Sequence, residues 1–477
     1  MANDKEISLR KAALIYAIAR YSTVIINLLI TAVLSRLLLP SEYSIVALVT
    51  VFSTLFAAIS NMGIGTGIIQ FKELDQNDFI DLFSLSFYIS IAMAVLFVLL
   101  GYPVSHIYND SAYINVFLVL SISVFFTSLN SVPDAILLRE KKFMAVGVRM
   151  IVTTTLSGVV AIILAFEGFS YYSLLIQMVI AAAGNAVWNI VSTKLKLKFR
   201  FETKAIKIIF KYSSFQFAYN LLNYFAQNLD NLLIPKTIGA EDLAYYNKSY
   251  TLMRYPINLL PHAISPVLHP VLSNYQDNKK IIYEKYIQVL KILSILGIYI
   301  TVVCFFFADD IIRFLFGPNW SQAVLPFRIL SLCIWAQLIN AIAGSIYQSL
   351  GKTDKMFISG SIHVGVTICA TLIGALSQNL CILSICVMIS LNIKFFIESF
   401  FLIRKCFESK LKDFFCFFIP DIINMICLFI VGHGLSCINI SNCFISLICK
   451  CGICLIVYII ILIFSKQIKY IYGIVIK

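Results

Sequence analysis

The sequence contains few charged residues. Of its 477 residues only 13% are charged, and 24 of them are Asp or Glu, whereas 60% are hydrophobic. Soluble domains are about half apolar and a quarter charged, so this composition excludes an ordinary soluble domain. The first fifteen residues, MANDKEISLRKAALI, lack a small-residue cleavage site, and we expect the first helix to be retained.

The chain also lacks patterns typical of catalysis or metal binding. We find no nucleophile–base pair and no metal-ligand cluster in it. Cys451 and Cys454 have Cys-x-x-Cys spacing, but a zinc site needs four converging ligands and no second pair matches. We interpret these Cys as small hydrophobic residues. A disulfide between Cys437 and Cys443, in a short outer loop, is left open. We predict no enzyme activity, no cofactor and no metal.

Long apolar runs such as FYISIAMAVLFVLL and CLIVYIIILIF recur along the whole chain. About 20 such residues cross a bilayer as a helix. The sequence therefore predicts an all-α polytopic membrane protein with about 14 transmembrane helices. The predicted spans are 12–36, 43–68, 80–103, 113–133, 144–166, 170–193, 209–235, 243–272, 286–307, 322–347, 356–377, 380–403, 414–434 and 444–465.

The net charge of +13 is unevenly distributed between alternate connections. Basic residues gather in the connections on the side of the N-terminus, including the run 194–211 and the pair Arg404 and Lys405. The opposite side holds few, among them Arg36 and Arg328. This bias is typical of cytoplasmic loops. It places both termini in the cytoplasm and argues against a nucleic-acid partner.

Two loop segments 200 residues apart resemble each other. RLLLPSEYSIVAL begins at Arg36 and KTIGAEDLAYYNK begins at Lys236, and an acid, Glu42 or Asp242, follows six positions later. We therefore predict two six-helix lobes related as parallel repeats, with a central cavity at their interface. The predicted divisions are an N-terminal lobe at 1–193, a basic cytoplasmic linker at 194–211, a C-terminal lobe at 207–405, and two extra helices with a cytoplasmic tail at 406–477.

A polar stripe follows one face of the seventh predicted span. Its members are three or four residues apart, the spacing of one helix face, and they are Ser213, Gln216, Asn220, Asn223, Gln227 and Asp230. The offset of 200 gives the corresponding positions in the first span as Ala13, Tyr16, Arg20, Thr23, Asn27 and Ile30. We interpret both stripes as walls of the central cavity. In the alternative interpretation they only form hydrogen bonds with neighbouring helices.

Charged residues elsewhere in the spans have more ordinary interpretations. Lys394 and Glu398 are four residues apart and can neutralise each other, so we interpret them as a structural pair first and a site second. Asp134 and Arg139 are expected at the membrane interface. Arg254 lies two residues before the first of four Pro in the eighth span. Interior Pro removes helix hydrogen bonds, so a bent or broken helix is expected there.

The segments LSRLLLPSEYSIVALVTVFSTLFAAISNMGIGTGIIQ and NLDNLLIPKTIGAEDLAYYNKSYTLMRYPINLLPHAISPVLHPVLSNYQ resemble bacterial polysaccharide flippases of the multidrug, oligosaccharidyl-lipid and polysaccharide exporter superfamily. The resemblance covers the whole chain, with Ser44 and Ala244 where members usually have Gly. It implies two six-helix lobes, often with two further helices. It also implies export of polyprenyl-pyrophosphate-linked oligosaccharides across the bacterial cytoplasmic membrane, for O-antigen, capsule or exopolysaccharide synthesis.

Residue chemistry fits such a substrate. Arg offers bidentate donors to a pyrophosphate, and we assign that role to Arg20 and Arg254. Asp230 is the candidate for a coupling proton or sodium ion, or else a structural partner of a base such as Lys236. The side chains expected to contact pyrophosphate or sugar hydroxyls beside these are Tyr16, Thr23, Asn27, Gln216, Asn220, Asn223 and Gln227. Membrane lipids and other polysaccharide-assembly membrane proteins are the further partners considered.

Two other functions stay open at this point. A cation-coupled drug or small-molecule antiporter shares the implied fold but favours an acidic cavity over a basic one. A membrane polysaccharide polymerase or ligase usually carries a sizeable outer loop with catalytic residues. The longest outer connection here is FFADDIIRFLFGPNWSQAV.

Overall fold

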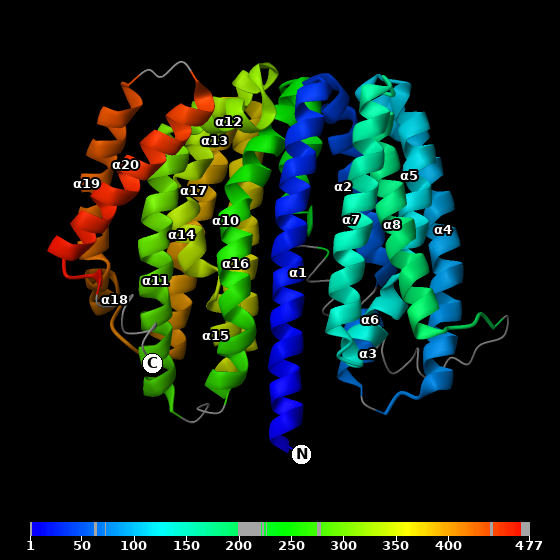
Figure 1. Ribbon diagram of the computed structural model, residues 1–477, viewed down its shortest axis with the longest axis horizontal. Coiled ribbons are helices and arrows are strands. Elements are labelled where there is room, and N and C mark those ends of the chain that lie inside the picture. The colour runs from blue at the N-terminus through cyan, green and yellow to red at the C-terminus, as the bar shows by residue number, and fades with distance from the viewer. Residues whose placement is uncertain are drawn as a thin grey trace. The chain divides into compact units, whose positions relative to one another are not determined.

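The computed structural model confirms the all-α class (Figure 1). It describes residues 2–61, 64–71, 73–198, 221, 224–225, 227–273, 278–438 and 442–468. Within these ranges every regular element is a helix. The chain forms two compact units, Met1–Ala244 and Tyr245–Lys477.

The first unit is built from long helices that pack side by side, with α1 against α7, α4 against α5, and α8 against both α5 and α7 (Figure 1). A break at Asn130 divides its fourth predicted span into α5 and α6. Its labelled helices are α1 (Ala2–Leu37), α2 (Pro40–Asn61), α3 (Ile64–Gln70), α4 (Gln76–Tyr108), α5 (Ala112–Leu129), α6 (Ser131–Arg139), α7 (Phe143–Phe166) and α8 (Tyr172–Thr193).

The second unit follows with α10, which begins in the last residues of the first unit and runs unbroken through four Pro. Its α16 and α17 pack along each other, and α11 contacts both α14 and α19. The elements are α10 (Ala240–Ser273), α11 (Lys279–Phe306), α12 (Ala308–Phe316), the 3-10 helix η1 (Pro318–Ala323), α13 (Val324–Ser331), α14 (Ile334–Asn340), α15 (Ala343–Ser349), α16 (Thr353–Leu376), α17 (Leu380–Ser399), the π-helix η2 (Phe400–Cys406), α18 (Leu411–Phe417), α19 (Ile419–Ser436) and α20 (Cys443–Phe464).

Helix boundaries follow local capping chemistry. The Asp75 carboxylate accepts hydrogen bonds from the Asn77 and Asp78 amides, and Asp78 accepts one in return, which is a capping box at the start of α4. The same helix ends at Asn109 in the left-handed conformation. Asn379 caps α17 and Asn442 caps α20. These caps supply hydrogen-bond partners for amides at the helix starts, which have no acceptor within their own helix.

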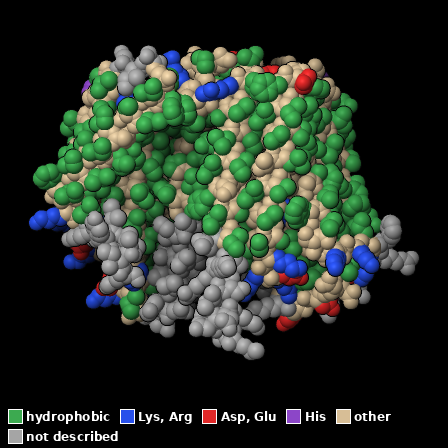
Figure 2. Space-filling model, in the orientation of Figure 1, with side chains coloured by type: hydrophobic (Ala, Val, Ile, Leu, Met, Phe, Trp, Pro, Cys, Tyr) green, Lys and Arg blue, Asp and Glu red, His purple; other side chains and the backbone are tan. Residues whose placement is uncertain are grey.

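The described helices are long and apolar enough for a multi-pass membrane protein. Eleven could each cross a bilayer, and a twelfth results if the helices on either side of a 52° bend between Ser331 and Ile334 form one span. Figure 2 shows hydrophobic side chains over most of one face, with Lys and Arg mainly toward its edges. Every predicted span overlaps a helix, but part of 209–235 lies outside the described residues. The count of fourteen therefore stays a prediction.

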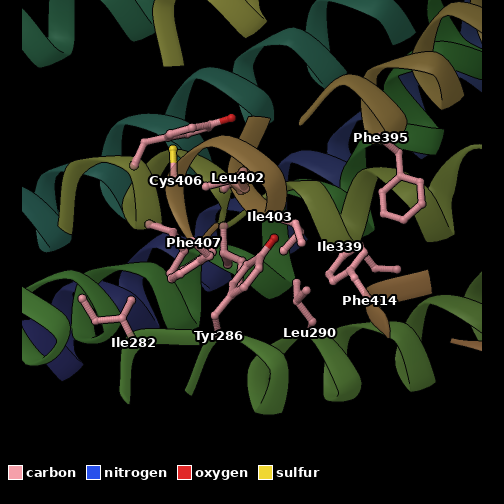
Figure 3. Close-up of a cluster of buried hydrophobic side chains, with 14 of the residues drawn as sticks. Ile282, Tyr286, Leu290, Ile339, Phe395, Leu402, Ile403, Cys406, Phe407 and Phe414 are labelled. Atoms are coloured by element: carbon pink, nitrogen blue, oxygen red, sulfur yellow. The ribbon is translucent and has the colours of Figure 1, made fainter. Parts of the chain in front are cut away.

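The core of the second unit joins α11 to the last part of the chain. Tyr286 and Leu290 of α11 pack against Phe407 and Phe414, with Phe395 of α17 nearby (Figure 3). Aromatic stacking and apolar burial therefore bring the η2–α18 segment onto the helices that precede it. The extra C-terminal helices belong to this second unit.

Two turns that lie 200 residues apart, both within Met1–Ala244, resemble each other. Helix α1 ends at Leu37 and α2 begins at Pro40, while the helix over 227–237 ends before α10 begins at Ala240. The Glu42 carboxylate accepts from the Leu39 amide at 2.6 Å. A Cβ on Gly239 would lie 2.5 Å from Asp242 Oδ2. The Asp242 carboxylate therefore also lies close to the backbone of its own turn. These features support the predicted repeat, which stays a prediction, as do the divisions at 1–193, 194–211, 207–405 and 406–477.

Candidate functional site

The first unit contains a pocket of about 410 Å³ between α1, α6, α7 and α8. It lies toward the start of α7, which lines it from Val146 to Thr154, and α8 contributes Asn185. Polar side chains dominate this lining. They are Tyr16, Arg20, Thr23, Asn130, Asp134, Arg149, Thr153, Thr154 and Asn185.

Helix α1 contributes Tyr16, Arg20 and Thr23 to one wall. Their spacing of four and three places them on one helix face. Arg20 is exposed and Thr23 is buried, with its hydroxyl donating to the Ala19 carbonyl at 2.8 Å. Asn27 is half-buried one turn further along and is not among the residues that line the pocket. The structure thus brings three of the four predicted α1 residues to one pocket.

A polar network connects α6, α7 and α8 at the pocket. Arg149 of α7 donates from Nη1 to Asp134 Oδ1 of α6 at 2.8 Å. Asn189 of α8 donates to the same carboxylate oxygen at 3.2 Å and to Asn130 Oδ1 at 2.8 Å. The network therefore holds α6, α7 and α8 together, and three of its members, Asn130, Asp134 and Arg149, line the pocket.

A further contact extends the network along α7 and α8. The Thr153 hydroxyl lies 3.2 Å from Asn185 Oδ1 and donates to the Arg149 carbonyl at 2.8 Å. Asn185 donates in turn to the Ala181 carbonyl of its own helix. These hydroxyl and amide groups present both donors and acceptors to the pocket, which is what a sugar or a hydrated anion requires.

The Asp134 carboxylate lines the pocket and pairs with Arg149, and its predicted position at the membrane interface stays a prediction. Arg139 instead donates to the Ile68 and Leu74 carbonyls and lies over the Phe79 ring. Sequence reasoning missed Arg149 altogether. The signal was present, because an Arg early in an apolar span needs a partner.

The pocket has a positive balance of charge. Two guanidinium groups, from Arg20 and Arg149, and one carboxylate, from Asp134, line it. The Asp134 side chain is 34% exposed while that of Arg149 is 7% exposed. Charged groups interact more strongly where water is scarce, so this arrangement favours an anion over a cation.

The second unit holds a separate group of charges around Arg254. The guanidinium of Arg254 lies 5.8 Å from the centre of the Tyr250 ring. Glu398 is buried and accepts a hydrogen bond from Ser359 at 3.3 Å. Lys394 and Glu398 lie one turn apart on α17, and the structural pair predicted for them stays a prediction.

Part of the predicted stripe in the seventh span lies outside the described residues, namely Ser213, Gln216, Asn220 and Asn223. Of the remaining two, Gln227 is exposed and Asp230 is 6% exposed. Asp230 Oδ1 accepts from the Asn231 amide at 2.8 Å. The Tyr108 hydroxyl donates to the Leu232 carbonyl at 2.9 Å, which fixes this segment against α4. Lys236 is exposed.

All thirteen Cys are free thiols, Cys437 and Cys443 included. In the part of the chain that the structure describes, no group of three or more His, Cys, Asp or Glu side chains is placed to hold a metal ion.

Comparison with solved structures identifies the fold class. The chain superposes on the lipid II flippase MurJ in an inward closed conformation with a TM-score of 0.76 and 17% identity, covering 95% of this chain and 99% of that one. An inward-facing multidrug resistance MATE family transporter of the MOP superfamily matches with a TM-score of 0.62 and 15% identity, over 80% and 96% of the two chains. The fold is that of these membrane transporters.

The sequence identifies the family. The profile of the polysaccharide biosynthesis protein family matches residues 33–325, which is more than half of the chain. This chain therefore belongs to that family.

Curated relatives carry related descriptions. The teichuronic acid biosynthesis protein TuaB of Bacillus subtilis is 22% identical over 307 residues, 64% of each chain. The lipopolysaccharide biosynthesis protein WzxC of Escherichia coli is 20% identical over 72% of this chain and 70% of its own. The succinoglycan biosynthesis transport protein ExoT of Rhizobium meliloti is 19% identical over 72% and 74%. The chain thus spans about two thirds to three quarters of these three relatives.

Proposed function

We propose that this protein is a flippase that moves polyprenyl-pyrophosphate-linked oligosaccharide units across the cytoplasmic membrane for surface polysaccharide synthesis. The family and the transporter fold support a role in transport for polysaccharide synthesis. The main support for this substrate is the lining of the pocket, where Arg20 and Arg149 lie beside hydroxyl and amide side chains. Such a lining matches an anionic head group joined to sugars.

In this proposal the two lobes alternate access to a shared central cavity. Arg20 and Arg254 hold the pyrophosphate, one from each half of the chain. The hydroxyl and amide groups beside Arg20 bind sugar hydroxyls, while the prenyl tail stays in lipid. The protein acts as a transporter and not as an enzyme, with both termini in the cytoplasm and with proton or sodium coupling through Asp230.

A deletion strain tests the function directly. Cells that lack the protein should accumulate a lipid-linked oligosaccharide on the cytoplasmic side and lose the surface polymer. Wild-type protein should restore export, whereas Arg20→Ala and Arg254→Ala should not, because truncating one partner of a charge pair that the bound head group would bury costs about 2–5 kcal/mol. Arg→Lys should rescue in part, since it keeps the charge but loses the bidentate fork.

Arg404→Ala is a matched control, because Arg404 is an exposed Arg at the end of η2, and it should export normally. Full export by both Ala variants at normal membrane levels would contradict the assignment of these two Arg. Unchanged lipid-linked intermediates in the deletion strain would contradict the function itself. Increased drug sensitivity of that strain with normal surface polymer would point to an antiporter instead.

A further inference from the structure

The pocket of the first unit contains a charge pair whose two members have no separate roles in the export mechanism proposed above. Arg149 lies on α7 and Asp134 on α6, and both line the pocket. A buried ion pair is weak evidence for stability, because desolvation of the two charges offsets their attraction. A pair placed on a pocket wall can instead serve binding.

Arg149 has donor capacity left over. Its residue is 6% exposed, and its Nη1 donates to Asp134. The Nε atom is buried and finds no hydrogen-bond partner among the described residues. A guanidinium has five N–H donors in a planar fork, and a buried donor without a partner is costly. An acceptor that takes the place of Asp134 beside the guanidinium would find this donor unoccupied.

Asp134 is the more accessible member of the pair. Its side chain is 34% exposed, against 7% for Arg149. One oxygen, Oδ1, receives both the Arg149 guanidinium and the Asn189 amide. Asn189 also donates to Asn130, so it keeps a partner if the carboxylate moves. The geometry therefore allows Asp134 to move away from Arg149 while Asn189 keeps its hydrogen bond to Asn130.

Arg20 supplies a second cation on the α1 side of the same pocket. A carboxylate and a phosphate offer a guanidinium the same kind of bidentate oxygen pair. With two Arg and one Asp on the lining, an entering anion meets net attraction, but it competes with Asp134 for Arg149.

We propose that this pocket is an anion subsite for a phosphate or pyrophosphate group, in which Arg149 and Arg20 are the cations and Asp134 is the resident counter-ion that the anion replaces. The proposal deepens the export function and rests on it for the physiological ligand, the head group of a lipid-linked oligosaccharide. Because Asp134 returns to Arg149 when the anion departs, it keeps binding weak enough for release.

The test is binding of inorganic pyrophosphate to the purified full-length protein, measured by titration calorimetry. Asp134→Asn keeps an oxygen for Asn189 and removes the competing charge, so affinity should rise about tenfold, since unscreened charges a few ångströms apart interact strongly. Arg20→Gln should lower it by a similar factor. Asp310→Asn, which removes the carboxylate partnered by Lys450 at 2.9 Å in the second unit, is the matched control and should leave affinity unchanged.

Thermal melting of each variant identifies folding defects. If Asp134→Asn does not fold, the affinity of Arg20→Gln, a substitution at an exposed position, tests the subsite. Affinity that is unchanged or weaker in folded Asp134→Asn, or unchanged in Arg20→Gln, would overturn the subsite. A parallel titration in nanodiscs containing a polyprenyl pyrophosphate separates the two sources of ligand. If the lipid head group is the ligand, Asp134→Asn should tighten binding of the polyprenyl pyrophosphate. If the free ion is the ligand, the same substitution should tighten binding of inorganic pyrophosphate and leave binding of the lipid unchanged.

The subsite and the export function can fail separately. One outcome would contradict the subsite and support export: lipid-linked oligosaccharide accumulates in the deletion strain, but Asp134→Asn does not change the affinity for pyrophosphate. The opposite outcome would support the subsite and contradict export: Asp134→Asn raises the affinity for pyrophosphate, but deletion of the protein changes no lipid-linked intermediate.

Discussion

At the scale of single residues, charge within an apolar span needs a partner from another helix. A charge near the bilayer centre costs roughly 3 kcal/mol or more on insertion scales. Arg149 meets Asp134 and Lys291 meets Asp421, each across two helices. Sequence alone identifies such residues as exceptional but cannot pair them, because their partners are set by helix packing. This is why Arg20 could be selected from a stripe while Arg149 was missed.

Asp230 is the residue for which charge and shape can be separated most cleanly. It is buried and accepts the Asn231 amide, which Asn at the same position could also do. If Asp230 exchanges a coupling ion, Asp230→Asn should stop export or remove its dependence on an imposed pH or sodium gradient. If Asp230 is structural, export should keep that dependence.

The measurement is transport of lipid-linked oligosaccharide into proteoliposomes under a series of imposed gradients. Asn228→Asp is a control. Asn228 is half-buried in the same segment, so this substitution adds a charge there and leaves position 230 unchanged. Normal, gradient-dependent export by Asp230→Asn would place the coupling site elsewhere.

At the scale of helices, the breaks within spans were the main features that the sequence did not reveal. The span 322–347 bends by 52° between α13 and α14, with neither Pro nor Gly at the break. There the Trp335 amide donates to the Thr301 hydroxyl of α11 at 3.1 Å. A tertiary hydrogen bond thus satisfies an amide that the break frees. Apolar periodicity cannot predict this, because the partner lies in another helix.

The buried pair Lys291–Asp421 joins α11 to α19. The two side chains are 2% and 0% exposed, and Nζ lies 2.5 Å from Oδ1. Ser294 donates to the other carboxylate oxygen at 2.8 Å. Asp421→Ala leaves a buried Lys uncompensated and should lower stability by about 3–5 kcal/mol, seen as a lower melting temperature in detergent.

The double variant Lys291→Met/Asp421→Leu removes both charges and should recover most of that loss, because well-packed apolar residues often replace a buried pair at little cost. A single variant as stable as the wild type would show that α19 is held to α11 by apolar packing alone.

Close packing of α16 on α17 depends on Gly374. A Cβ there would lie 2.7 Å from the Leu383 Cα, a backbone atom that cannot move without shifting its helix. Gly374→Ala should therefore destabilise the purified protein by about 1–3 kcal/mol. Gly365 lies in the same helix with nothing within 4 Å of its Cβ position, so Gly365→Ala should melt at the wild-type temperature or slightly above it. Equal melting of the two variants would rule out the steric explanation.

At the scale of the whole molecule, composition and apolar run length were enough to predict the class. Each bilayer crossing needs an apolar segment of similar length, so span positions such as 144–166 and 356–377 coincide closely with α7 and α16. Site prediction depended on the spacing along one helix. It brought Tyr16, Arg20 and Thr23 to one pocket, but it could not show that α6, α7 and α8 complete that pocket.

The predicted central cavity is a property of the whole molecule and can be tested by thiol accessibility. In a variant without native Cys, single Cys at positions 220, 223 and 227 would lie on the polar stripe of the seventh span. They should react faster with a small water-soluble maleimide than Cys at 222 and 229, which lie on the opposite face. Saturating lipid-linked oligosaccharide should slow the reaction at the stripe positions, because substrate and water share the cavity. Equal reactivity at all five positions would show that the stripe forms hydrogen bonds between helices and does not line an aqueous path.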